Sequence, residues 1–238
     1  MNTPPLVVVL SGGQDSTTCL WWAKRHYPDS PLHTISFDYG QRHRRELTAA
    51  LTVSALAAAE THRVVSIAEV LRSTSPLTSA AELETYTDAA SMDQIIGNRI
   101  EKTFVPLRNP LFLLIAANHA IALGAQALVT GVCAMDNANY PDCRPQFLIA
   151  MESLLSSALG TKQHPQIWAP LLYKTKAESV KLAQNLGALP ALAYSHTCYA
   201  GEYPPCGKCH ACLLRAAGFA EAGIPDPLVE RALQEGTA

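Results

Sequence analysis

The chain has 238 residues, of which 48% are hydrophobic, and 18 lysine and arginine residues nearly balance 20 aspartate and glutamate residues, for a formal net charge of −2. A balance this close to neutral argues against a protein that holds nucleic acid or an anionic membrane through its overall charge. The start, MNTPPLVVVLSGG, lacks the basic residues and long apolar run of a secretory signal, and the most apolar region, 111–129, is interrupted by polar residues. We therefore expect a cytoplasmic protein with no membrane segment, built as one domain or as a core domain with a small appendage.

Apolar runs typical of strands alternate along the chain with the spacing of amphipathic helices. Strands are predicted over residues 6–10, 32–37, 62–67 and 127–130, and helices over 15–26, 44–60, 110–123, 146–159 and 175–186. This alternation predicts an α/β fold, a doubly wound and mostly parallel sheet with helices on both faces. Ligands of such sheets bind at the carboxyl ends of the strands, which places along one rim the loops 11–18, 38–43 and 131–140.

The last predicted helix has clear boundary signals, because Thr175 and Glu178 form a capping box and a glycine directly follows its end. By contrast, residues 73–100 are rich in Ser, Thr and Ala and are weakly periodic, which predicts a long loop. A loop of this length in a compact domain is more often functional or mobile than purely structural, so it is a candidate lid. We expect residues 1–190 to form a nucleotide-binding α/β domain and residues 191–238 to form a small helical, zinc-binding segment.

The sequence LVVVLSGGQDSTTCL places a glycine-rich loop directly after the first predicted strand. Gly12 and Gly13 allow a tight turn, and the residues after them offer the free N–H groups of a helix start, where anions bind favourably. Glycine-rich loops for simple phosphoryl transfer carry a lysine before the Ser/Thr, whereas this loop has Asp15 there. A carboxylate beside a phosphate needs a bridging cation, so we expect Mg²⁺ to bind together with ATP.

The string SGGQDST after a strand resembles the loop of the PP-loop ATP pyrophosphatases, which have an adenine nucleotide alpha-hydrolase-like fold. The resemblance implies that ATP is split into AMP and pyrophosphate, that a carbonyl oxygen of the acceptor is adenylated, and that the loop cradles the pyrophosphate. The ATP-binding residues that it implies are Leu10, Ser11, Gly12, Gly13, Gln14, Asp15, Ser16, Thr17, Thr18, Cys19 and Leu20. Because one fold supports many acceptors, the loop indicates the activation chemistry and not the acceptor.

Four further polar stretches bear on the acceptor. They are FDYGQRH (37–43), FVPLRN (104–109), TGVCAMDNANYPDCR (130–144) and TCYAGEYPPCGKCHACLLR (197–215). Each of them alone is compatible with a solvated loop. Together and in this order they resemble the 7-cyano-7-deazaguanine synthase family, over nearly the whole chain from Leu6 to about Arg215. Residues 137–139 depart from the aromatic-Ser-Gly expected before YPDC, which bears only on local contacts.

That resemblance implies an ATP-dependent conversion of 7-carboxy-7-deazaguanine and ammonia into 7-cyano-7-deazaguanine, in queuosine biosynthesis. The carboxylate is adenylated and becomes an amide, and a second ATP adenylates the amide oxygen so that loss of AMP leaves the nitrile. Asp15, Arg108 and Lys176 are the catalytic candidates, since they can hold magnesium or neutralise phosphate charge, although a lysine on a helix surface is the ordinary alternative for Lys176. The substrate-binding candidates are Asp38, Gln41, Arg42, His43, Asn109, Asp136, Tyr140, Asp142 and Arg144.

Two choices within this set stay open on the sequence. Asp136 and Asp142 are alternative acceptors for the amino-pyrimidinone edge of the deazapurine. Cys133 and Cys143 lie near the predicted rim, but a direct adenylate route needs no thiol, so we expect Ser or Ala at both positions to leave turnover largely intact. The resemblance also implies a homodimer whose partners are ATP, ammonia and the small-molecule acceptor, with no direct nucleic-acid contact.

Four of the cysteines lie close together near the C-terminus with the spacing C-x7-C-x2-C-x2-C, at Cys198, Cys206, Cys209 and Cys212. In a cytosolic chain this pattern indicates a metal site rather than disulfides, and four thiolates make a closed, structural zinc site. We expect one zinc per chain, which pins the C-terminal segment beside the active site. The alternatives are an iron–sulfur cluster, whose ferredoxin-like run wants a cysteine where Ala216 stands, and a site in which His196 or His210 replaces one thiolate.

Two other functions are compatible with parts of the sequence. One is another PP-loop adenylating enzyme, an amide synthetase or a tRNA thiolase, but a thiolase is expected to present a basic RNA-binding surface and the net charge of −2 gives no support for one. The other is a zinc-ribbon nucleic-acid-binding module on a degenerate nucleotide fold. Intact Gly12, Gly13, Asp15 and Ser16 argue against degeneracy.

Overall fold

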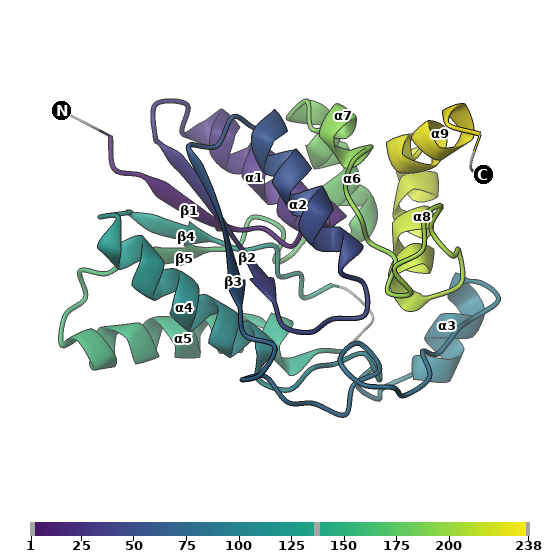
Figure 1. The fold of residues 1–238 in the computed structure, drawn as a ribbon, viewed down its shortest axis with the longest axis horizontal. Helices are drawn as coiled ribbons and strands as arrows, with labels where there is room; N and C mark the ends of the chain where they lie inside the picture. The colour runs from purple at the N-terminus through teal and green to yellow at the C-terminus, as the bar shows by residue number, and fades with distance from the viewer. Residues whose placement is uncertain (1–2, 136–138, 237–238) are drawn as a thin grey trace.

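The computed structural model describes residues 3–135 and 139–236, and its centre is a five-stranded parallel sheet with the strand order β3-β2-β1-β4-β5 (Figure 1). The strands are β1 (Leu6–Val9), β2 (Leu32–Asp38), β3 (Thr61–Ser66), β4 (Ala127–Val129) and β5 (Gln166–Trp168). The helices are α1 (Gln14–His26), α2 (Arg45–Leu56), α3 (Ala89–Ile96), α4 (Arg108–Ala122), α5 (Pro145–Leu159), α6 (Lys176–Asn185), α7 (Leu189–Leu192), α8 (His210–Ala222) and α9 (Pro227–Gln234), with a short 3-10 helix over Pro141–Cys143. This architecture confirms the predicted doubly wound α/β fold.

The centre of the sheet is buried on both faces, and alternate residues of β1 point into opposite layers. Leu6 and Val8 pack in one core with Leu20 of α1 and Val53 of α2. Val7 packs in the other core, which α4 and α5 cover. Helices α1 and α2 thus lie on one side of the sheet and α4 and α5 on the other (Figure 1). These two cores fix the positions of the loops that leave the strands.

The order of the strands reverses between β1 and β4, because β2 and β3 extend the sheet in one direction and β4 and β5 in the other. The connections that leave β1 and β4 therefore diverge and leave a crevice at their carboxyl ends. Gly12 turns the chain here with a φ of +85°, and a Cβ added to it would lie 2.3 Å from the carbonyl oxygen of Glu46. A side chain at position 12 would push α2 away from the loop.

Helix α2 ends at Leu56, sooner than predicted. Ala58 adopts a φ of 56°, and the N–H of Glu60 donates to the carbonyl of Leu32 at 2.8 Å, which begins the alignment of β3 with β2. Alanine has the highest intrinsic helix propensity, so the local sequence predicts a continued helix up to residue 60. Pairing with the sheet, which is a tertiary interaction, decides otherwise.

The prediction of a continuous loop over 73–100 was wrong, because this segment contains helix α3. The Asp88 side chain accepts a hydrogen bond from the Ser91 N–H at 2.7 Å and caps the helix. The usual capping box has Glu or Gln at this third position, so the serine made the signal weak. The buried face of α3 packs against Leu213 and Leu214 of α8. A lid function for the segment stays a prediction.

The C-terminal part of the chain is helical, as expected, and packs against α6. The capping box of α6 is confirmed, with hydrogen bonds that join Thr175 and Glu178 in both directions. Helix α8 approaches α6 at Gly218, where an added Cβ would lie 2.5 Å from Cγ of Lys176. Strand β5 was not predicted, since three residues carry too little periodicity. Within the described residues, no helix has both the length and the apolar composition that a membrane crossing requires.

Candidate active site at the switch point of the sheet

A cavity of about 260 Å³ opens at the carboxyl ends of β1, β2 and β4. Its walls come from the loop after β1, the segment after β2, the start of α4, the loop after β4, the first turn of α6 and the region around the start of α8. Parallel α/β sheets bind their ligands at this switch point. The loops that the sequence analysis placed along one rim therefore meet there, together with the C-terminal segment.

The loop after β1 is held closed by its own hydroxyl groups. The Ser16 hydroxyl accepts from the Ser11 N–H at 3.2 Å and lies 3.0 Å from the Ser11 hydroxyl, which itself accepts from the Gly13 N–H at 3.3 Å. The loop after β4 comes close to the start of α1, because a Cβ added to Gly131 would lie 3.0 Å from the Ser16 nitrogen. The N-terminus of α1, with its partial positive charge, thus borders the cavity.

The predicted ATP-binding residues fall into two groups. Leu10, Ser11, Gly13, Gln14, Asp15 and Ser16 line the cavity. Gln14 is buried, and its Nε2 has no hydrogen-bond partner within the described part of the chain, so it can donate to a ligand. Gly12 serves the turn, whereas residues 17–20 are fully buried in α1 and support the loop from behind. Direct contact with ATP is thus expected only from the first group.

Asp15 and Lys176, two of the catalytic candidates, are joined by an ion pair across the cavity wall. Nζ of Lys176 lies 2.9 Å from Oδ2 of Asp15, and both side chains are mostly buried. Lys176 reaches this position from the first turn of α6. The pair places a positive charge and hard carboxylate oxygens beside the N-terminus of α1, which is the combination that a magnesium–phosphate complex requires.

Arg108, the third catalytic candidate, begins α4 on the opposite wall. Its guanidinium donates to the Tyr39 hydroxyl at 3.3 Å and lies 5.7 Å from the centre of the Tyr39 ring. Burial raises the pKa of Tyr39 well above its usual value, so this phenol is neutral at physiological pH. Arg108 therefore keeps its full positive charge at the cavity, where it can meet an anionic ligand.

An aromatic wall, formed by Phe37, Tyr39, Phe112 and Tyr199, lines the part of the cavity next to Arg108. Phe37 stacks on Phe112 with ring centres 4.2 Å apart, and Tyr39 meets Phe112 edge to face at 5.4 Å. Flat aromatic surfaces of this kind suit a planar heterocycle. The sequence analysis missed these residues as site residues, although Phe37 and Tyr39 stand in the FDYGQRH stretch, because an aromatic side chain is most often ordinary core.

Of the four candidates after β2, the structure brings only His43 into the cavity. The Asp38 carboxylate pairs with the exposed Arg44, and Arg42 is exposed and donates to the carbonyl of Ala81 at 2.9 Å. The Gln41 amide is fully used inside the protein: it accepts from the backbone of residue 39 and donates to the backbone of residue 37 and to a neighbouring carboxylate. The prediction that Asp38, Gln41 and Arg42 touch the substrate is therefore not supported by their positions.

The candidates around the loop after β4 contribute three side chains to the cavity, from Asn109, Tyr140 and Arg144. Asn109 donates to the backbone carbonyl of Asp142 at 3.3 Å, and Arg144 donates to the carbonyl of Ala134 at 2.6 Å. Asp142 itself is buried behind this wall, and burial, opposed by the charge of Arg108, raises its pKa. Asp136 lies outside the described residues, so the choice between the two aspartates stays open.

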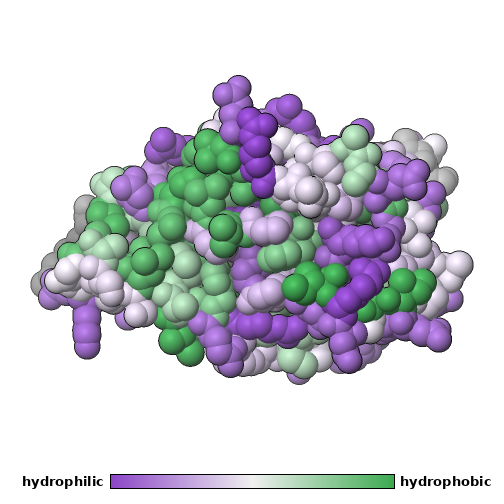
Figure 2. All heavy atoms as spheres, turned by 90° about the horizontal axis from the view of Figure 1, so that it is seen from below, coloured by the Kyte–Doolittle hydropathy of each residue, from purple (hydrophilic) through white to green (hydrophobic). Residues whose placement is uncertain are grey.

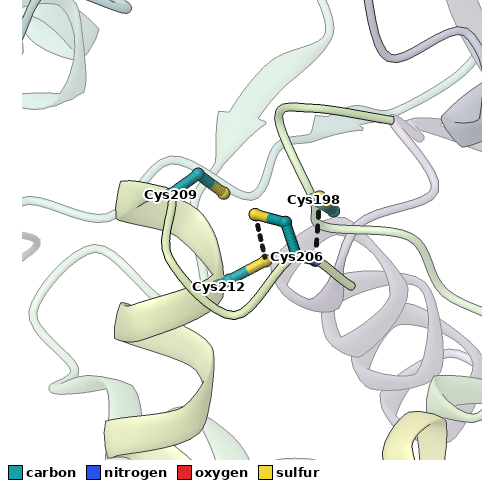
Figure 3. Close-up of side chains that lie close together, drawn as sticks. All are labelled: Cys198, Cys206, Cys209 and Cys212. Atoms are coloured by element: carbon teal, nitrogen blue, oxygen red, sulfur yellow. Dashed lines mark hydrogen bonds between the residues drawn. The ribbon is translucent and has the colours of Figure 1, made fainter. Parts of the chain in front are cut away.

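The four cysteines of the C-terminal motif converge, as Figure 3 shows. Their Sγ atoms all lie within 4.8 Å of one another, and those of Cys206 and Cys212 are 3.9 Å apart. Four sulfurs at 2.3 Å from a tetrahedral zinc are separated by roughly 3.8 Å, so the cluster fits that ion. His196 instead bonds to the backbone carbonyl of Cys198, at 3.2 Å.

Comparison with known proteins agrees with this geometry. The family model described as queuosine biosynthesis protein QueC matches residues 5–223. The chain belongs to the QueC family. A 7-cyano-7-deazaguanine synthase from Chromobacterium violaceum is 48% identical and aligns over 96% of this chain and 94% of that protein. The synthase from Laribacter hongkongensis is also 48% identical, over 94% of this chain and 94% of its own length.

Among solved structures, the U34-tRNA thiolase NcsA from Methanococcus maripaludis superimposes with a TM-score of 0.48 at 17% identity, over 94% of this chain and 74% of that one. This distant similarity adds nothing to the family assignment. The family that the sequence motifs predicted is thus confirmed by the QueC match and by the curated relatives.

The cavity wall also contains residues that were not predicted as site residues from the sequence. Glu46 and Thr197 line the cavity of this family member beside the predicted residues. Arg215, at the end of the fourth motif, also borders it, but its guanidinium is occupied by Asp226 at 2.6 Å and 2.8 Å and by the Ser195 hydroxyl at 2.8 Å. Arg215 therefore anchors α9 to α8 and is not expected to bind phosphate.

Proposed function

We propose that this chain is an ATP-dependent carbon–nitrogen ligase that converts 7-carboxy-7-deazaguanine and ammonia into 7-cyano-7-deazaguanine, in queuosine biosynthesis. One observation carries the proposal: a single cavity joins a PP-loop, a lysine–aspartate pair and an aromatic wall, in a chain of the QueC family whose relatives are named for this nitrile. Each adenylation turns a poor oxygen leaving group into AMP, which explains why the site offers phosphate-binding groups and aromatic surface together.

The phosphates of ATP would lie against the N-terminus of α1. Backbone N–H groups of the loop and the Gln14 amide donate to the leaving pyrophosphate, while Lys176 and Arg108 offset the charge that develops on it. Asp15 is the residue that would hold a magnesium ion bound together with ATP, and that ion would offset negative charge on the phosphates. The chain's own contribution is to hold the α-phosphorus next to the acceptor oxygen.

The deazaguanine ring would lie against the aromatic wall. Stacking on these side chains orients the plane of the ring, and Asn109 and Arg144 provide donors at its edge. The amino-pyrimidinone edge needs an acceptor, for which Asp136 and Asp142 are the candidates. We expect the carboxyl group of the substrate to point toward the PP-loop, since its oxygen attacks ATP.

The cysteine cluster would hold one structural zinc ion. Four thiolates fill the coordination of zinc and leave no position for a substrate, so no step of the reaction is expected to pass through it. Its role is to fix the loop before α8 against the cavity, where His210 and Leu214 contribute to the wall. Reduced thiols persist in the cytoplasm, which is where we place the enzyme.

We further propose that the chain forms a homodimer through the outer surface of α4 and α5. Leu114, Ile121, Ile149 and Leu154 are exposed on this surface. Figure 2 views the molecule from the side that these helices cover and shows hydrophobic residues gathered over its left half. The single charged residue of α5, Glu152, bonds to the N–H of Ile167 instead of joining the outer surface. An uncharged surface can meet its own copy without repulsion.

The test is a turnover assay with 7-carboxy-7-deazaguanine, ATP, magnesium and ammonium, followed by mass spectrometry and nucleotide chromatography. We expect the nitrile to form with AMP and pyrophosphate. ADP in place of AMP would contradict the PP-loop assignment. Formation of AMP with only the amide as product would make the protein an amide synthetase. If 7-carboxy-7-deazaguanine is not converted but AMP is released when tRNA is added, a thiolase would be favoured.

A further inference from the structure

His43 and Glu46 form a buried pair on the wall of the cavity. Nε2 of His43 lies 3.2 Å from Oε2 of Glu46, whose other oxygen accepts from Nε2 of Gln41 at 2.9 Å. His43 is 3% exposed and Glu46 is 9% exposed. The second ring nitrogen of His43, Nδ1, is also buried and has no hydrogen-bond partner among the residues that the structure describes. A carboxylate at one ring nitrogen favours the tautomer in which the other carries a free lone pair.

The pair lies directly behind the PP-loop. Gly12 of the loop packs on the backbone of Glu46, and its carbonyl accepts from the His196 N–H at 2.8 Å. On its other side, the His43 ring packs against Tyr199 of the aromatic wall, with ring centres 5.5 Å apart. The imidazole is therefore held between the loop that would bind phosphates and the surface that would bind the heterocycle. This is where the reacting carbon has to lie.

Nitrile formation requires a base at this point. The nitrogen of the adenylated amide loses one proton to become a neutral imidate, and then loses its second proton while the C–O bond breaks and the electron pair leaves with AMP. Lys176 and Arg108 are cations, and the Asp15 carboxylate is paired with Lys176. Nδ1 of His43, which has no partner among the described residues, can accept a proton here, whereas Nε2 of His196, on the same cavity wall, lies 3.2 Å from the backbone carbonyl of Cys198. Glu46 can stabilise the protonated form of His43.

We propose that His43, oriented by Glu46, is the general base that takes the proton from the imidate nitrogen as AMP leaves. The imidazolium forms beside the Glu46 carboxylate and returns the proton to solvent after the products have gone. This role rests on the proposed function, because only a nitrile-forming enzyme has an imidate to deprotonate. Gln41 contributes as a positioning residue, since it holds the Glu46 carboxylate in place.

The experiment starts from the amide of 7-carboxy-7-deazaguanine with ATP, so that only the second half of the reaction is measured. We expect His43→Ala to lower the rate of nitrile formation by roughly 10²-fold or more, with a much smaller change in KM for ATP. Added imidazole is expected to restore part of the rate, and restoration should increase with the pKa of substituted imidazoles. His119→Ala is the matched control, since Nε2 of His119 is likewise buried without a partner among the described atoms but lies outside the cavity. This control should retain the wild-type rate.

Glu46→Gln supplies a second variant, should alanine at position 43 disturb folding. Loss of the carboxylate makes the imidazolium less stable, so the acidic limb of the pH–rate profile should move to lower pH while the maximum rate falls. Unchanged nitrile formation in a folded His43 variant, rescue that is independent of the added base, or an unmoved acidic limb would overturn the role of the pair. Failure of the wild-type protein to convert the amide would instead overturn the proposed function, and the base with it.

Discussion

Lys176 is held from two sides, and both contacts depend on neighbours distant in sequence. Its Nζ pairs with Asp15 at the start of α1, and its aliphatic stem passes over Gly218 of α8. A lysine in the first turn of a helix is normally exposed, and the local sequence alone left that alternative open. Because position 218 has no side chain, α8 can pack closely against the stem of Lys176, whose ammonium group lies at the cavity.

Gly218→Ala is therefore expected to destabilise the protein by about 1–3 kcal/mol, because its Cβ would lie 2.5 Å from Cγ of Lys176. The sign of this stability change tests the packing, since replacing glycine with alanine inside an exposed helix usually stabilises a protein by about 1 kcal/mol. We also expect AMP formation to slow, because the lysine must leave Asp15. Urea unfolding and AMP release measure the two effects. A more stable variant with wild-type turnover would contradict this packing argument.

The segment between β3 and α4 acts as a strap between the cysteine module and the cavity. Tyr86 donates its N–H to the carbonyl of Lys208 at 2.8 Å, and its hydroxyl lies between two carboxylates, 3.0 Å from Glu84 and 3.3 Å from Glu101. Glu101 is buried, accepts from the N–H of Thr103 at 2.6 Å, and accepts from the Tyr140 hydroxyl at 3.3 Å. Tyr86, in the middle of the predicted lid, thus contacts the carboxylate that holds the cavity residue Tyr140.

Glu84 supports this strap through ion pairs with Arg99 at 2.7 Å and Lys102 at 2.8 Å. Partial burial alone would raise the pKa of Glu84, but hydrogen bonds from Lys102, Arg99 and Tyr86 outweigh it and lower the pKa from 4.5 to about 2. Since the folded state prefers the ionised form, the stabilisation is complete above pH 4.5 and is lost as pH falls toward 2.

We expect Glu84→Gln to lower the free energy of unfolding at pH 7 by roughly 0.5–1 kcal/mol, as for partly exposed ion pairs. The difference from the wild type should stay constant down to about pH 5 and shrink below it. Urea unfolding of both proteins over this pH range measures this difference in the free energy of unfolding. Loss of zinc in acid affects both proteins alike, so it does not change the difference. Glu82→Gln, at an exposed neighbouring position, is the control. If the difference in the free energy of unfolding between the two proteins grew as the pH fell, the lowered pKa of Glu84 would be contradicted.

The cysteine loop and α8 form the other element whose integrity the cavity requires. Cys206→Ser leaves three thiolates, so we expect less than one zinc per chain, a lower midpoint of thermal unfolding and at least about a tenfold loss of turnover. Elemental analysis, thermal unfolding and the nitrile assay measure these outcomes. A wild-type protein that contains iron and absorbs visible light would contradict the zinc assignment.

At the scale of the whole molecule, the outer surface of α4 and α5 is where a second copy is expected. Ile149 is 68% exposed on this surface, so Ile149→Asp should convert the dimer to a monomer by adding a carboxylate to the interface from each copy. Light scattering coupled to size exclusion gives the mass. Leu51→Asp is the control, because Leu51 is 57% exposed on α2, on the other side of the sheet. If the Ile149→Asp protein is still a dimer, the interface lies elsewhere. If the wild-type protein is a monomer, the homodimer itself is contradicted.

Local patterns predicted four of the five described strands, most helices, the PP-loop and the cluster of four cysteines. The strands and the PP-loop have short-range causes: a short continuous apolar run marks a strand that is buried on both faces, and two glycines before a helix start mark a loop that can approach a phosphate. The spacing of Cys206, Cys209 and Cys212 brings three sulfurs together within one turn of chain. The end of α2 and helix α3 were mispredicted, because sheet pairing and contact with α8 decided them.

By itself, therefore, the sequence determined the class of fold and, through motifs in a fixed order, the family. Only the tertiary structure decided which polar residues face the cavity. Asp38, Gln41 and Arg42 stand beside His43 in the chain, yet only His43 lines the cavity. The physical reason is that a turn after a strand sends neighbouring side chains in different directions, and packing against distant elements selects the one that stays at the cavity.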